Sequence, residues 1–182
     1  MDAVIASTLR QLLDTQPVAA LATLHRGEPA VSMVPFVLPA GTSEIFIHVS
    51  ALSTHTRDML DHPRVGLMVM ADARAGVPPQ ALPRVSLQAV ARQLPADGDE
   101  PARARAPYLA RFPAAAGTFE LADFSLFALH PVSARLIAGF GGFLGRKHDG
   151  HPGPKAIWEG MQKVRAFAIA FAATRAVYAG DG

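Results

Sequence analysis

The segment from Ser50 to Arg57 gathers hydroxyl, imidazole and guanidinium groups in one short stretch. It follows an alternating apolar run, 44–49, that is typical of a strand, and it precedes a short helical segment, 56–60, which Pro63 brings to an end. A corner between a strand and a helix N-terminus exposes backbone N–H groups and favours anions, so we predict a phosphate site here. The competing interpretation is a plain capped helix, because serine and threonine are common at helix starts without any ligand.

The composition is that of a folded protein of ordinary domain size. The chain has 182 residues, of which 50% are hydrophobic and 18% are charged, and its formal net charge is +2. Lysine and arginine are scattered along the sequence, so nothing indicates a surface for nucleic acid. We therefore expect a globular protein whose partners are small molecules.

Several absences from the sequence narrow the chemistry further. There is no cysteine, which excludes disulfides and thiolate catalysis and fits a reducing compartment. A basic signal-peptide start and an apolar run of about 20 residues are both missing, so we expect a cytoplasmic protein with no membrane span. There is also no Ser-His-Asp spacing, no carboxylate pair and no Gly-x-Gly-x-x-Gly loop, which leaves the catalytic residues unassigned.

Strands joined by short loops dominate the predicted secondary structure, and short loops favour antiparallel pairing. The segment Arg64–Met70 is apolar at nearly every position and is predicted to be a strand buried on both faces. So many strands need a sandwich or a closed barrel to hide their edges, and we predict a mainly β fold, a β-barrel with short helices. The predicted strands are 18–24, 30–38, 44–50, 64–70, 82–94, 124–129 and 134–140, and the predicted helices are 3–15, 56–60, 101–111 and 155–178.

Short motifs follow one another in the order strand, turn, strand, turn, Ile-Phe-Ile-His-Val-Ser (45–50), Ser-Thr-His-Thr-Arg (53–57) and Asp-His-Pro-Arg-Val (61–65). This order resembles the pyridoxamine 5′-phosphate oxidase-like family of FMN-binding split barrels, over residues 14–141. Other motifs resemble the haem-utilisation branch of that family. They are Pro83–Leu87, Tyr108–Pro113, Asp123–Phe127 and Ala138–Gly141.

The resemblance implies a six-stranded split barrel that forms a homodimer, with FMN in a cleft at the subunit interface. It implies an FMN-dependent oxidoreductase, a flavoprotein acting on a small aromatic or haem-like molecule, in which the flavin supplies the redox chemistry. Family members place basic residues at the corner and under the flavin ring, so neutralising the phosphate here falls to His55, Arg57 or Arg84. The implied cofactor-binding residues are Ser32, Met33, Val34, Pro35, Ser50, Ser53, Thr54, His55, Thr56, Arg57, Arg84 and Ser86.

Two alternative functions stay open for the same fold. The haem-utilisation motifs, with His48, His55, His148 and His151, allow a protein that binds or degrades haem or another tetrapyrrole. The missing basic residues and the altered segment 142–148 allow a cofactor-free dimeric binding module. Taken singly, a histidine in an apolar strand such as His48 is more often a structural residue than a ligand. The histidine pair at 148 and 151 is more often a surface loop than a metal site.

The sequence divides into a split-barrel domain at 1–141 and a C-terminal loop and helical extension at 142–182. In the extension, apolar residues recur at steps of four and three, which predicts an amphipathic helix that docks on the barrel or on the second subunit. These residues are Ile157, Met161, Val164, Ala168 and Phe171.

Overall fold

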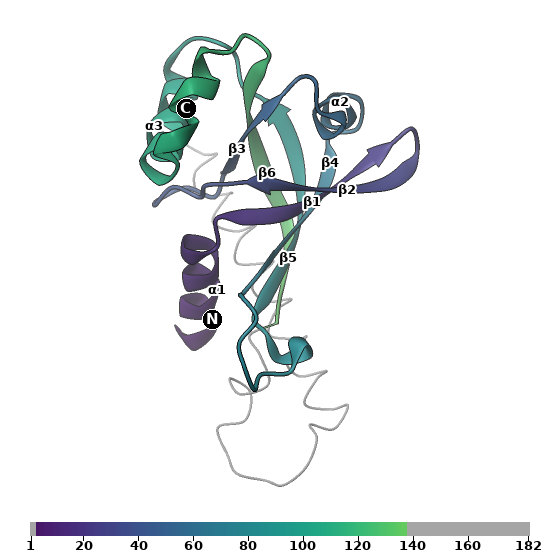
Figure 1. Ribbon diagram of the computed structural model, residues 1–182, viewed down its shortest axis with the longest axis vertical. Helices are drawn as coiled ribbons and strands as arrows, with labels where there is room; N and C mark the ends of the chain where they lie inside the picture. Colours follow the sequence, from purple (N-terminus) through teal and green to yellow (C-terminus); the bar gives the residue numbers. More distant parts are fainter. Residues whose placement is uncertain (1–2, 138–182) are drawn as a thin grey trace, which may run out of the picture.

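Within residues 3–137, six antiparallel strands form one sheet that curls into a half-barrel, with short helices packed around it (Figure 1). The computed structural model describes residues 3–137, so the predicted extension at 142–182, with His148 and His151, lies outside the described residues. The elements are α1 (Ala3–Thr15), β1 (Val18–His25), β2 (Glu28–Pro35), β3 (Ile45–Ser50), α2 (Thr54–Asp61), β4 (Arg64–Met70), η1 (Pro79–Ala81), β5 (Arg84–Gln93), α3 (Asp99–Arg111), η2 (Pro113–Glu120) and β6 (Phe124–Ile137).

The outer strands of the sheet meet at one point. The strand order is β2-β1-β4-β5-β6-β3. Just beyond β2, Val37 exchanges two backbone hydrogen bonds with Phe46 of β3, with N–O distances of 2.9 and 2.8 Å. This bridge covers part of both sheet edges, which would otherwise expose unpaired backbone groups. The predicted mainly β fold is confirmed in this half-barrel form.

The β1–β2 hairpin shows how local sequence fixes the start of the sheet. His25 and Glu28 pair across a two-residue turn, in which Arg26 has φ of 53° and Gly27 has φ of 86°. Two positive φ angles are typical of a type I′ turn, whose twist matches that of the flanking strands. The predicted turn at 25–28 is therefore confirmed.

The inner face of the sheet holds the main hydrophobic core. Alternate residues of β1, β4 and β5 enter it, because successive side chains of a strand face opposite sides of the sheet. α1 adds Leu9, Leu12 and Leu13 to this core. No helix among the described residues is long and apolar enough to cross a membrane. A smaller hydrophobic cluster forms where α3 contacts β3 and β6. This cluster contains Val37, Phe46, Leu94, Ala104, Tyr108, Leu126 and Ala128.

The prediction of two final strands was wrong. The structure has one continuous strand, β6, through the residues 130–133 that were predicted to connect them. Pro131 lies within β6, opposite Ala89, and the register between β5 and β6 shifts between Gln88 and Ala89. Such an irregularity lets a strand continue through a proline, which has no N–H to donate.

The prediction that the strand 64–70 is buried on both faces was also wrong. Val65, Leu67 and Val69 are buried in the core, as an inward-facing set should be. On the opposite face, Met68 is 40% exposed and Met70 is 45% exposed, because none of the elements described above covers it. The sheet therefore has a packed inner face and an apolar outer face that is open to solvent.

Candidate functional site

The predicted corner forms where β3 passes into α2. Ser53 is the N-cap residue of α2, and its side chain makes no capping hydrogen bond. The Ser50 hydroxyl instead donates to the Asp123 carboxylate at 2.5 Å, and the Thr56 hydroxyl donates to the Ser50 carbonyl at 2.7 Å. The Arg57 guanidinium donates to the Leu52 carbonyl at 3.2 Å. The polar groups of the corner are thus largely engaged with one another.

These contacts weaken the fit of the corner to the phosphate of FMN. A phosphate dianion needs free donors and neighbouring positive charge. Here the hydroxyls of Ser50 and Thr56 are already used, and the Asp123 carboxylate would repel a second anion. The helix N-terminus and the hydroxyls of Ser53 and Thr54 stay available, so the corner is a poorer phosphate site than its sequence suggests.

Two predicted site residues carry buried polar atoms without a partner. The Oγ of Ser32 and the Nε2 of His55 are the side-chain atoms in this condition among the described residues. Burial lowers the pKa of His55 from its ordinary value, and the nearby Asp58 carboxylate partly offsets the shift. Buried polar atoms are normally hydrogen-bonded, so an unpaired one indicates that a water molecule or a ligand group completes the site.

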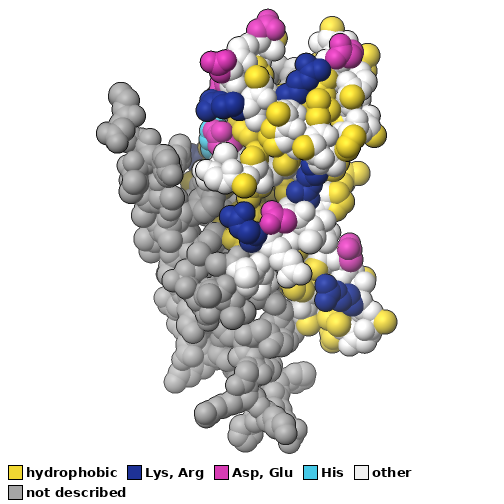
Figure 2. All heavy atoms as spheres, turned by 90° about the vertical axis from the view of Figure 1, so that its left-hand side faces the viewer, with side chains coloured by type: hydrophobic (Ala, Val, Ile, Leu, Met, Phe, Trp, Pro, Cys, Tyr) yellow, Lys and Arg dark blue, Asp and Glu magenta, His cyan; other side chains and the backbone are white. Residues whose placement is uncertain are grey.

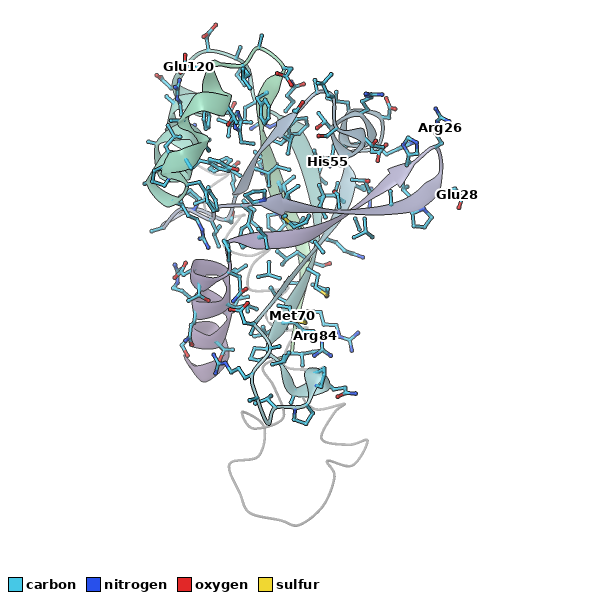
Figure 3. All side chains as sticks on the ribbon, viewed as in Figure 1. Arg26, Glu28, His55, Met70, Arg84 and Glu120 are labelled. Carbon is cyan, nitrogen blue, oxygen red and sulfur yellow. The ribbon has the colours of Figure 1, made fainter. Side chains whose placement is uncertain are left out.

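The outer face of the sheet brings a second group of predicted residues together. Directly paired strand residues share a face, so cross-strand pairs build rows across the sheet. One row is Met33, Ala20, Met68 and Ser86. The adjacent row contains Met70 paired with Arg84, and these two side chains lie beside each other in Figure 3. The sequence predicts Met33, Arg84 and Ser86 as site residues, but not Met68 and Met70, because the apolar run 64–70 predicts a strand buried on both faces.

The corner and the outer face are separated within one subunit. Ser50 pairs with Phe124 at one end of β6, and Arg84 pairs with Ile137 at the other end. A strand advances by about 3.3 Å per residue, so roughly 40 Å of strand lies between the two pairs. Figure 3 likewise labels His55 near α2 and Arg84 well away from it. Within one chain the corner and Arg84 therefore lie at opposite ends of β6, and Val34, 1% exposed, belongs to neither group because it lies in the core.

A buried carboxylate joins α2 to β1. Asp58 is 4% exposed and accepts hydrogen bonds at 2.8 Å from the Thr23 hydroxyl and from Nδ1 of His25. Burial alone would raise the pKa of Asp58, but these hydrogen bonds and the nearby imidazoles lower it below its ordinary value. Asp58 therefore stays ionised and holds the corner against the end of β1. No sequence motif singled it out, since both partners are distant along the chain.

His48 has the structural role that its apolar strand predicts. Its ring stacks on Phe119 with a centroid distance of 3.8 Å, and its Nδ1 lies 3.3 Å from the Thr118 hydroxyl. Burial, together with the positive charge of Arg105, lowers the pKa of His48 to about 4. A neutral, stacked imidazole suits the packing of η2 on β3.

The half-barrel, its open apolar face and the corner at α2 define a split-barrel protein. The chain belongs to the pyridoxamine 5′-phosphate oxidase family, whose family model matches residues 5–138. This confirms the resemblance seen in the sequence, including its haem-utilisation branch. A second match, to the Transposase Tn5 dimerisation domain, covers residues 126–181, which is less than half of the chain and lies mostly outside the described residues.

Curated relatives of the chain are named as heme oxygenases. The chain is 33% identical to the chloroplast heme oxygenase HOZ of Arabidopsis thaliana over 117 residues, which are 63% of this chain and 33% of that protein. It is 31% identical to the heme oxygenase HutZ of Vibrio cholerae over 123 residues, or 66% of this chain and 69% of HutZ. The match thus spans only about a third of the chloroplast protein.

Solved structures that match the chain include proteins described as binding or storing heme. A heme binding protein from Mycobacterium smegmatis matches with a TM-score of 0.67 and 33% identity, over 75% of this chain and 55% of that one. HutZ from Vibrio cholerae, described there as a heme storage protein, matches with a TM-score of 0.67 and 26% identity, over 72% of this chain and 94% of HutZ. A bacterial FAD-binding protein, from Mesorhizobium loti, shares the fold at 15% identity.

We predict that Asp58→Asn lowers the free energy of unfolding at pH 7 by about 1.5–3 kcal/mol, since it removes a buried, hydrogen-bonded charge. The folded-state pKa lies below the ordinary value of 3.8, so the carboxylate stabilises the fold above that value. Its contribution is lost as the pH falls through the lowered folded-state pKa. Urea unfolding of the wild type and of Asp58→Asn, at pH values from 7 to 3, measures how the difference in free energy of unfolding depends on pH.

The matched control is Asp61→Asn, which changes an exposed carboxylate on the same helix. We expect it to alter the free energy of unfolding by less than about 0.5 kcal/mol. Equal losses in the two variants, or a loss for Asp58→Asn that is the same at every pH, would contradict the role assigned to Asp58.

Proposed function

We propose that this chain is a haem-binding or haem-degrading protein, with haem in place of FMN as its ligand. The observation that carries the proposal is its identity of 31–33% to proteins named heme oxygenase. The heme binding protein of Mycobacterium smegmatis, at 33% identity over most of this chain, supports the same ligand. The haem alternative is thus better supported than an FMN-dependent oxidoreductase.

The geometry of both residue groups agrees with this choice. At the corner, hydroxyls that FMN phosphate would need are engaged, and Asp123 adds a negative charge. On the outer face, exposed methionines suit a large flat apolar ring better than they suit a polar ribityl phosphate chain. In a degrading enzyme haem is the substrate, so the protein has to bind it, orient it and admit oxygen and a reductant.

We also propose that the chain acts as a homodimer with its ligand cleft at the subunit interface. The corner and Arg84 lie at opposite ends of β6 in one subunit, and a second copy can bring its corner beside the Arg84 end of the outer face. Exposed apolar residues such as Val31, at 74% exposure, mark that face as an interaction surface. The cytoplasmic location and the domain boundary at 141 stay predictions of the sequence.

Light scattering on the purified chain tests the dimer. We expect twice the mass of one chain, both with and without haemin, because the apolar face is present in either state. A monomer that binds haemin at full affinity would contradict an interface cleft and leave haem binding intact.

We predict that the purified chain binds haemin saturably and does not retain FMN. Titration of the protein with haemin should give a sharpened, shifted Soret band that saturates at a fixed ratio of haemin to chain. In a parallel titration, FMN fluorescence should stay unquenched. Heat-denatured protein is the control for adsorption, which produces no defined Soret maximum.

The degrading activity has its own readout. With ascorbate, oxygen and catalase present, a degrading enzyme loses the Soret band and releases iron that a ferrous chelator captures. Stable haem under these conditions would restrict the function to binding. Tight FMN binding without a defined haemin complex would contradict the proposal.

A further inference from the structure

Two arginines of the outer face lack the carboxylate partner that Arg92, farther along the same face of β5, has in Glu100. Arg92 pairs with Glu100, and Arg105 pairs with Glu120 at 3.1 Å. Figure 2, seen from the side of α1 and α3, shows dark blue and magenta side chains lying close together. Arg84 and Arg135 take part in no ion pair with any residue of the described range.

These two arginines lie close together on the same face. Ser86 pairs directly with Arg135, and Arg84 pairs with Ile137, so Arg84 and Arg135 are diagonal neighbours. Diagonal neighbours on one face of an antiparallel pair are about 7–8 Å apart. The Arg84 guanidinium donates to the backbone carbonyls of Gln80 and Leu82, which fixes its position without neutralising it. Two adjacent unneutralised cations favour an anionic ligand.

None of the outward strand residues in the paired rows of this face is acidic, and the carboxylates that reach the face, Glu44 and Glu100, pair with His130 and Arg92 away from Arg84. Its outward residues on β2, β1 and β4 are apolar or small except for Arg64, which pairs with Val90 at the end of β4 away from Met70. Most outward residues of β5 and β6 near Arg84 are polar or basic. Ala20, Ala22 and Gly66 lie at the centre, where small side chains leave a flat surface. The face is therefore divided into an apolar half and a cationic half. The apolar half contains Val18, Ala20, Ala22, Leu24, Val31, Met33, Gly66, Met68 and Met70.

We propose that this face is one wall of the haem site, with the macrocycle on the methionine rows and the two propionates on Arg84 and Arg135. The inference rests on the proposed haem function and adds the contacts that orient the ligand. Charge complementarity selects this occupant, since a flat apolar ring with two carboxylates at one edge matches both halves of the face. The contact row runs from Met33 through Ala20, Met68 and Ser86 to Arg135.

The test compares haemin with haemin dimethyl ester, in which both propionates are neutral. We expect Arg84→Gln and Arg135→Gln each to weaken haemin binding about 10-fold, the loss of one charge-assisted contact. Neither change should alter the affinity for the ester, so the preference for haemin over the ester disappears in the double variant. Soret titrations of the full chain measure both affinities. Arg103→Gln, on α3, is the matched control and should leave the affinities for haemin and for the ester unchanged.

A second pair of variants tests the apolar half. Met68→Glu places a carboxylate in the centre of the row, and we expect it to weaken haemin and the ester alike, by about 10-fold or more. Leu121→Glu changes a comparably exposed apolar residue, 50% exposed, and should leave both affinities unchanged. Light scattering on each variant verifies that its mass equals that of the wild type.

The outcomes separate this inference from the proposed function. A wild type that binds haemin, together with a double variant that keeps the preference over the ester, overturns the propionate contacts and leaves haem binding standing. The same holds if Met68→Glu changes the mass of the particle but not haemin affinity, which would make the face only a contact between copies. A wild type that binds neither haemin nor the ester overturns the function and this inference together.

Discussion

The pairing of β6 with two partners is the constraint on which the rest of the structure depends. Its 14 residues pair with β3 near one end and with β5 along most of the strand. Phe127 and Leu129 lie where the two pairings overlap, and both are almost completely buried. Because β3 leads into α2 while β5 begins at Arg84, this arrangement holds the corner and the cationic half of the outer face at opposite ends of β6.

The two faces of the sheet have different roles. The inner face stabilises the fold, since burying apolar surface contributes about 25 cal/mol per Å². On the outer face Val31 is 74% exposed and Met33 is 62% exposed. An open apolar surface of this kind indicates a binding site. Arg84 and Arg135, which form no ion pair with any described residue, lie along one side of this surface. The same alternation of residues along each strand therefore produces both the core and the proposed haem wall.

Local features were predictable from the sequence, whereas distant contacts were not. The α1 helix and the turn at Arg26 and Gly27 depend on residues close together in the chain, and both agree with prediction. The hydrogen bond from Ser50 to Asp123 joins residues 73 positions apart, and it changes the character of the corner. The exposure of Met68 depends on what covers β4, which no periodicity reports. The family resemblance was correct, yet the phosphate site depended on a contact that short motifs cannot show.

The most direct test of the account is methyl NMR of the chain labelled at methionine, recorded with and without ferric haemin. Ferric haem broadens nearby methyl signals, and zinc protoporphyrin serves as the diamagnetic control. The account predicts that the signals of Met33, Met68 and Met70 broaden, while that of Met59, 2% exposed within the core, stays sharp. Sharp signals from all three outer methionines at saturating haemin would contradict it.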